Sequence, residues 1–131
     1  VQYCTPTTGY NRGLSGYRYN GICARHNEID FVEALDYGLA VYKEVQILKN
    51  LKNQHQKEQG YIHRLEDELR FKEEQLISGR LSKVKAVIIL NETKEIAEEL
   101  GKAKSNLSAL DYDINKQSRR VSRMKHQSGY H

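Results

Sequence analysis

The chain has no tryptophan and a single proline, Pro6, among its 131 residues. Because proline interrupts helices, its absence after position 6 leaves the rest of the chain free to form long ones. No run of 18 apolar residues occurs, so the sequence predicts no membrane-spanning helix. It also lacks a glycine-rich phosphate loop, a Cys-x-x-Cys pair and a His-Glu-x-x-His motif. We therefore predict that the protein is not an enzyme and that it binds no cofactor and no metal ion.

Composition favours solvated helices over a single large core. Hydrophobic residues make up 38% of the chain and charged residues 29%. Lys, Glu, Leu, Ala, Gln and Asn dominate the second half. This balance is typical of long helices in water rather than of a β-sandwich or a doubly wound sheet. The fold class that we predict is all-α.

Residues 1–29 are predicted to form a small base rich in glycine and tyrosine. Thr5 followed by Pro6 is a helix start, since proline suits the first helical position. Three glycines then recur and would give this helix a smooth face for a second backbone: Gly9, Gly13 and Gly16. Asn20-Gly21 is expected to end the helix. Six of the nine tyrosines are expected to pack the base against the next helix: Tyr3, Tyr10, Tyr17, Tyr19, Tyr37 and Tyr42.

The two cysteines, Cys4 and Cys23, both fall in this base. An even count in one small region fits a disulfide formed in an oxidising compartment. Two buried free thiols are the alternative. A metal site is a weaker one, because no other ligand lies at a suitable spacing.

Residues 30–126 carry two apolar seams that predict an antiparallel coiled-coil helical hairpin on the disulfide-closed base. Asp30, with Glu33 three positions later, is expected to cap the first helix. From Leu48 the first seam alternates steps of three and four, interrupted by polar residues at His55, Glu58 and Lys72. Nine of eleven positions are apolar in the second seam: Ile89, Thr93, Ile96, Leu100, Ala103, Leu107, Leu110, Ile114, Gln117, Val121 and Met124. His55 is read either as a ligand or pH switch, or as a polar core position that fixes the register.

One register satisfies both seams, pairing Leu69 with Ile89, Ile62 with Ile96, Leu51 with Leu107 and Leu48 with Leu110. Its centre is Gly79, within a break at Ser78-Gly79-Arg80, so we predict a turn near residues 78–82. Ser82 can cap the second helix. Residues 127–131 are expected to form a tail.

Near this turn the apolar residues exceed what one seam can bury. We predict that the surplus forms a partner-binding surface at the tip of the hairpin: Phe71, Leu76, Ile77, Leu81, Val84, Val87 and Ile88. The alternative is that the helix ends splay and cover these side chains internally.

After Asp113 the chain has no acidic residue, and five cations follow: Lys116, Arg119, Arg120, Arg123 and Lys125. One interpretation is a helix end whose cations complement the helix dipole. The other is a basic patch that faces anionic lipid headgroups or an acidic partner. Nucleic acid is not expected as a partner, because no binding motif accompanies the charge.

Several features of the base occur together in a known family: Tyr3-Cys4, Gly9, Gly13, Gly16, Tyr19, Gly21, Cys23, Phe31 and the stretch from Tyr37-Gly38 to Tyr42. Over residues 3–50 the chain resembles a family of uncharacterised Gram-negative envelope proteins, many of them predicted lipoproteins, with a Cys–Gly–Gly–Gly–Cys signature. The resemblance implies an extracytoplasmic location, supports the disulfide and supplies no catalytic residue. The residues before Cys4, Val-Gln-Tyr, are not a lipoprotein cleavage box, so a lipid-bearing cysteine, if one exists, is expected upstream of Val1.

These observations lead to an expected function. We expect a non-enzymatic interaction or scaffold protein of the periplasm, associated with the outer membrane, whose hairpin binds another envelope protein or a second copy of the chain. Two alternatives stay open: a periplasmic chaperone or holdase, and an immunity or inhibitor protein.

Overall fold

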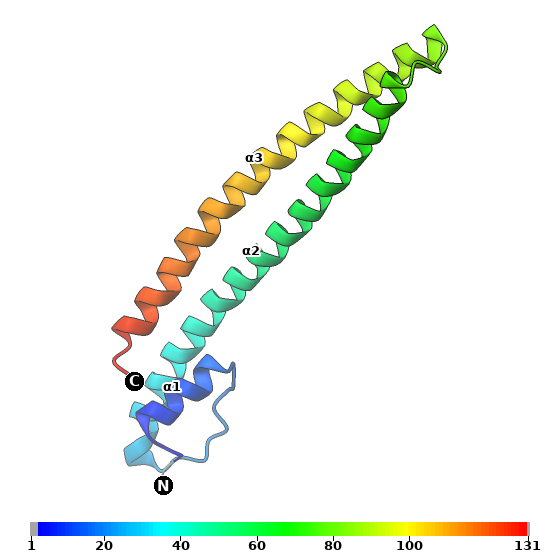
Figure 1. The fold of residues 1–131 in the computed structure, drawn as a ribbon. Coiled ribbons are helices and arrows are strands. Elements are labelled where there is room, and N and C mark those ends of the chain that lie inside the picture. Colours follow the sequence, from blue (N-terminus) through cyan, green and yellow to red (C-terminus); the bar gives the residue numbers. More distant parts are fainter. Residues whose placement is uncertain (1–2, 131) are drawn as a thin grey trace. The chain divides into compact units, whose positions relative to one another are not determined.

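The computed structural model describes residues 3–130, which form three helices (Figure 1). Helix α1 spans Pro6–Leu14, α2 spans Arg25–Ile77 and α3 spans Lys83–Gln127. The predicted all-α class is confirmed. The described residues divide into two packing units, a first unit of residues 3–50 and 114–130 and a second unit of residues 51–113.

Two of the helices begin where the sequence predicts. The hydroxyl of Thr5 accepts a hydrogen bond from the backbone N–H of Thr8 at 3.2 Å, directly before α1. The hydroxyl of Ser82 accepts one from the N–H of Lys85 at 3.3 Å, directly before α3. Each serves as an N-cap, because it satisfies an N–H group that has no partner within the helix.

Helix α2 begins at Arg25, so the capping role that we predicted for Asp30 is wrong. The N–H groups of Asn27 and Glu28 both donate to the carbonyl of Ala24 at 2.9 Å, which establishes helical hydrogen bonding before Asp30 is reached. Residues 25–28, which precede the predicted start, are polar but include neither glycine nor proline. Glu28 in the first turn also favours this start, since an acidic side chain complements the helix dipole there.

Helix α1 ends earlier than the predicted stop at Asn20-Gly21, because Gly16 closes it. Gly16 has a φ of +82°. Its N–H donates to the carbonyl of Gly13 at 2.9 Å, and the N–H of Tyr17 donates to the carbonyl of Arg12 at 3.0 Å. This pair of bonds is a Schellman motif, which ends a helix at a residue in the left-handed conformation. Gly16 therefore does not share a helix face with the other two glycines.

The backbones of α1 and α2 touch, and glycine is what permits it. A Cβ added at Gly9 would lie 2.6 Å from the carbonyl oxygen of Phe31, and one added at Gly13 would lie 2.7 Å from the nitrogen of Leu39. From the other side, a Cβ at Gly38 would lie 2.9 Å from the Cα of Gly13. Real Cβ atoms do not approach backbone so closely, so the predicted smooth face exists at Gly9 and Gly13 and meets a glycine on α2.

Two apolar clusters build the first unit around this contact. One has Tyr10, Ala34 and Val41 at its centre, with Leu14, Tyr37, Val45, Met124 and Tyr130 packed against them. The other has Cys23, Phe31 and Leu35 at its centre, with Tyr3, Cys4, Tyr19, Val32 and Leu39 around them. Five of the six tyrosines expected in the base core thus contact α2 or belong to it; Tyr17 is instead exposed, and Tyr42 packs its ring beneath Gly16.

The second unit has a single buried cluster between α2 and α3, made of Ile62, Leu65, Ile96, Leu100 and Ala103, with Tyr61, Leu69 and Leu107 beside it. Ile62 and Ile96, paired in the predicted register, are both in this cluster. Lys72 contacts Glu92 and Tyr61 contacts Glu99. Since residue numbers fall on α2 as they rise on α3, the two segments run antiparallel within this unit. The chain leaves helical geometry between Ile77 and Lys83, where the turn was expected.

We predict that Gly13→Ala lowers the free energy of unfolding by about 1–3 kcal/mol, because the new methyl group must push one backbone away from another. Gly60→Ala is the matched control. Gly60 also lies in a helix, but nothing is within 4 Å of the added Cβ, so the substitution is expected to stabilise the protein by about 0.5–1 kcal/mol. Urea unfolding measures both, and equal effects of the two substitutions would contradict the close contact.

Candidate interaction surfaces

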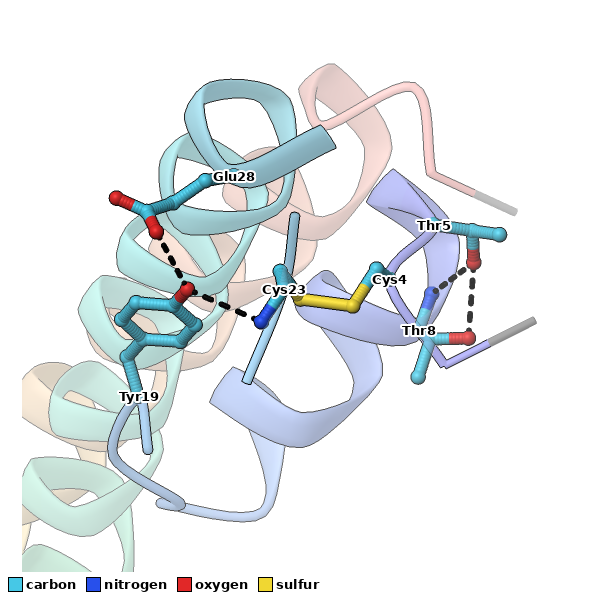
Figure 2. Close-up of a disulfide and its surroundings, with 6 residues drawn as sticks. All are labelled: Cys4, Thr5, Thr8, Tyr19, Cys23 and Glu28. Atoms are coloured by element: carbon cyan, nitrogen blue, oxygen red, sulfur yellow. Dashed lines mark hydrogen bonds between the residues drawn. A yellow bond between two sulfur atoms is a disulfide. The ribbon is translucent and has the colours of Figure 1, made fainter. Parts of the chain in front are cut away.

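A disulfide joins Cys4 to Cys23 and closes the loop that contains α1 (Figure 2). The two Cα atoms are 5.6 Å apart, and Cys23 is buried against Phe31 and Leu35. The prediction of a disulfide is confirmed. Each cysteine lies two residues before a helix, Cys4 before α1 and Cys23 before α2. The bond therefore holds the start of α1 beside the start of α2.

Tyr19 fixes the chain next to this disulfide. Its hydroxyl donates to a carboxylate oxygen of Glu28 at 2.9 Å and accepts from the N–H of Cys23 at 3.3 Å (Figure 2). Partial burial, and then the hydrogen bond to Glu28, raise the pKa of Tyr19 above its ordinary value. The phenol therefore keeps its proton at neutral pH and can donate to Glu28 throughout the physiological range.

The predicted tip residues lie in the second unit, on both sides of the loop at residues 78–82, and most are exposed. Leu76 and Leu81 are half-buried. The side chains that remain exposed, between 52% and 84%, are Phe71, Ile77, Val84, Val87 and Ile88. Leu90, which was not among the predicted residues, is exposed as well. We call the seven predicted residues the tip surface. Within this unit five of the seven side chains remain exposed, although soluble proteins bury most side chains of this kind.

The five cations after Asp113 all lie on α3 and are exposed. At 3.6 residues per turn, Lys116, Arg119, Arg120 and Arg123 share one side of the helix, and Lys125 lies on the opposite side. Arg120 forms an ion pair with Glu44 at 3.2 Å. Lys125 and His126 are in the last turn, where cations complement the helix dipole.

A hollow of about 660 Å³ lies next to Arg120 in the first unit. Its lining carries both signs of charge, with Asp36 and Glu44 alongside Arg18 and Lys43. It therefore does not select one class of charged ligand.

Three polar residues on the two seams have partners on the opposite helix. Lys72 donates to Glu92 at 2.5 Å. His55 lies 2.7 Å from a carboxylate oxygen of Asp111. In the first unit the side-chain amide of Gln117 donates both to the carbonyl of Glu44 at 2.9 Å and to its carboxylate at 2.7 Å. Three of the five polar positions on the seams, His55, Lys72 and Gln117, are thus cross-helix contacts. The register role that we considered for His55 stays a prediction.

Sequence reasoning missed Tyr130, which we had placed in a tail without a role. Its ring stacks on Tyr10, with the ring centroids 5.1 Å apart, and meets Tyr37 edge-on at 6.4 Å. The hydroxyl of Tyr37 also donates to the carbonyl of Met124 at 2.8 Å. The available sequence signal was Gly129 directly before this tyrosine. In the structure Gly129 has a positive φ, and the chain turns back there.

Within residues 3–130, no group of three or more His, Cys, Asp or Glu side chains is arranged to hold a metal ion. A helix both long enough and apolar enough to cross a membrane is likewise not found in this range.

We predict that reducing the disulfide lowers the free energy of unfolding of the first unit by about 3 kcal/mol, the value for a loop of this length. Urea unfolding followed with and without dithiothreitol measures the loss. In the Cys4→Ala, Cys23→Ala double variant, dithiothreitol should have no effect. An unchanged midpoint in the reduced wild-type protein would contradict a stabilising bond.

The pair of Lys72 and Glu92 provides a prediction for pH. The hydrogen bond to Glu92 raises the pKa of Lys72 above its ordinary value of 10.5, against the opposing effect of burial. Because the folded state holds the proton more tightly than the unfolded state, the stabilisation is complete below pH 10.5 and is lost as pH rises through the folded-state pKa.

A double-mutant cycle of Lys72→Met and Glu92→Gln, measured by urea unfolding, should therefore give favourable coupling at pH 7 that vanishes at high pH. The exposed pair of Arg70 and Asp67, 3.4 Å apart, is the control and should show weak coupling throughout. Coupling of Lys72 and Glu92 that is absent at pH 7 would refute the stabilising contact.

Residues 1–40 match the model of a family described as protein of unknown function (DUF2799). The matched residues contain both cysteines, all of α1 and the three glycines at the contact of α1 with α2. No curated protein and no solved structure matches the chain significantly. The match thus supports the expected resemblance to an uncharacterised domain over less than a third of the chain.

Proposed function

We propose that this chain is a non-enzymatic interaction or scaffold protein of the bacterial envelope. In this proposal α2 and α3 form an antiparallel coiled-coil hairpin, the first unit is its base, and the tip surface binds a partner protein. The observation that carries the proposal is the exposure of large aliphatic and aromatic side chains at the tip surface.

The hairpin rests on the spacing of apolar residues and on the contacts within each unit. Steps of three and four continue along α3 from Ile89 to Met124, which is the repeat of a coiled coil. Contacts between α2 and α3 occur in both units, at Tyr61 with Glu99 in the second and at Tyr37 with Met124 in the first. A continuous hairpin accounts for both sets with one register.

The choice of a protein partner rests on the kind of surface that is exposed. Burying isoleucine, valine and phenylalanine away from water lowers the free energy by about 25 cal/mol per Å² of apolar surface. In the second unit these side chains flank a five-residue break between helices, and the hollow among them, at Val84, Val87 and Ile88, is shallow. The surface therefore suits a broad contact better than an enclosed small ligand. Large exposed apolar patches are a mark of interaction sites.

The envelope location rests on the disulfide. Disulfides persist in oxidising compartments such as the periplasm and are rare in the cytosol. Closure of the loop from Cys4 to Cys23 therefore favours the periplasm, with the outer membrane as the nearby surface. The basic side of α3, at Lys116, Arg119, Arg120 and Arg123, would suit anionic headgroups there.

Photo-crosslinking tests the partner. A photoreactive residue in place of Ile77 should crosslink one dominant protein in intact cells, identified by mass spectrometry. Adding Ile88→Asp should abolish the crosslink, because a charge buried in an interface weakens binding about 30-fold or more. Far-UV circular dichroism should show unchanged helicity.

Tyr112→Asp is the matched control, since Tyr112 is 66% exposed in the same unit but outside the tip surface. It should leave the crosslink intact. Crosslinks that survive Ile88→Asp would count against the tip as the binding surface. A smear of many client proteins would instead point to a chaperone or holdase.

A further inference from the structure

The tip surface has two parts that face away from each other. Phe71, 61% exposed, lies on α2 two residues after Leu69, which packs toward α3. Two residues correspond to about 200° around a helix, so Phe71 projects from the side of α2 that is remote from α3. By the same reasoning Val87 projects from the side of α3 that is remote from α2, because it lies nine residues before Ile96, about 180° around the helix from that buried side chain.

The outer side of α3 is hollowed at this point. A shallow cavity of about 330 Å³ is lined by Val84, Val87 and Ile88, with Lys83 at its edge. Three aliphatic side chains and one cation make a site for an apolar group that is flanked by negative charge.

The cations at this end of α3 are not explained by the fold. Between positions 75 and 91 the chain has no acidic residue, but it has Arg80, Lys83 and Lys85. Cations at a helix N-terminus oppose the helix dipole, and α3 has no acidic residue in its first turn to offset them. In the described chain none of the three forms an ion pair.

The outer side of α2 has the opposite charge. Carboxylates surround the Phe71 ring on the helix surface. Asp67 lies four residues before it, Glu68 three before it and Glu74 three after it. Glu68 and Glu74 form no salt bridge within residues 3–130. An exposed aromatic ring with carboxylates around it is the complement of an aliphatic hollow with cations around it.

We propose that the tip surface binds a second copy of this chain, with Phe71 of one copy in the hollow of Val84, Val87 and Ile88 of the next. Glu68 and Glu74 then face Arg80 and Lys83 of the neighbour. Phe71 and the hollow project in opposite directions from the same chain, so the ring cannot enter the hollow of its own copy. The contact is heterologous, and each copy gives one ring and receives one. This inference rests on the proposed function and names the partner at the same surface.

Complementary single variants test the contact. In sedimentation velocity, the wild-type full chain should form oligomers that grow with concentration and weaken as salt screens the charges. Phe71→Asp and Val87→Asp should each reduce self-association roughly tenfold or more. Mixed one to one, they should form a dimer, since the first variant keeps its hollow and the second keeps its ring. An isologous contact through either surface alone would not give this rescue.

Tyr112→Asp should oligomerise like the wild type, and circular dichroism should show equal helicity in all variants. A monomeric wild-type chain, or a mixture of variants that stays monomeric, overturns the inference. If the monomer crosslinks a different protein from Ile77, self-association is wrong but the proposed function stands. If the monomer instead floats with phosphatidylglycerol vesicles and Val87→Asp abolishes this, the surface binds lipid and both proposals are overturned.

Discussion

The first unit depends on the direct contact of the α1 and α2 backbones at Gly13 and Gly38, which only residues without a side chain allow. With any side chain there, a nine-residue helix would stand off from α2 and leave Tyr10 and Phe31 partly in water. A helix of this length is not stable alone. We therefore expect α1 to form only when it packs against α2. The disulfide acts with this contact, because it keeps the start of α1 near the start of α2 even in the unfolded chain.

The second unit depends on a different rule, since two helices without a third can bury only one stripe each. Its cluster is accordingly thin, and polar pairs such as Lys72 with Glu92 and His55 with Asp111 lie along it. Each such pair contributes only modest stability, but a shift of one helix along the other would separate all of them together. In this unit the polar pairs would therefore favour one register of the two helices, while burial of the apolar residues stabilises their packing.

The sequence was sufficient where the signal repeats or is chemically narrow. Apolar spacing predicted the helices and the break before Lys83, two cysteines predicted the disulfide, and a surplus of apolar residues over one stripe predicted exposure at Ile77. It was insufficient where tertiary contacts decide. Asp30 is a good capping residue, but helical hydrogen bonding already begins at Ala24, and the Tyr19 hydroxyl contacts Glu28 in the first turn. Tyr130 has no periodic neighbour, so its aromatic stack could not be read from spacing.

Helix α2 passes through both units as one uninterrupted helix, although its surroundings change along its length. Near Phe31 it is packed by α1 and by the disulfide loop, whereas near Ile62 only α3 lies against it. Opening free energies should therefore differ between its two ends. Amide hydrogens of residues near Ala34 would exchange with deuterium mainly through unfolding of the whole first unit. Those near Leu65 would exchange through local separation of two helices, giving a gradient of protection within one helix.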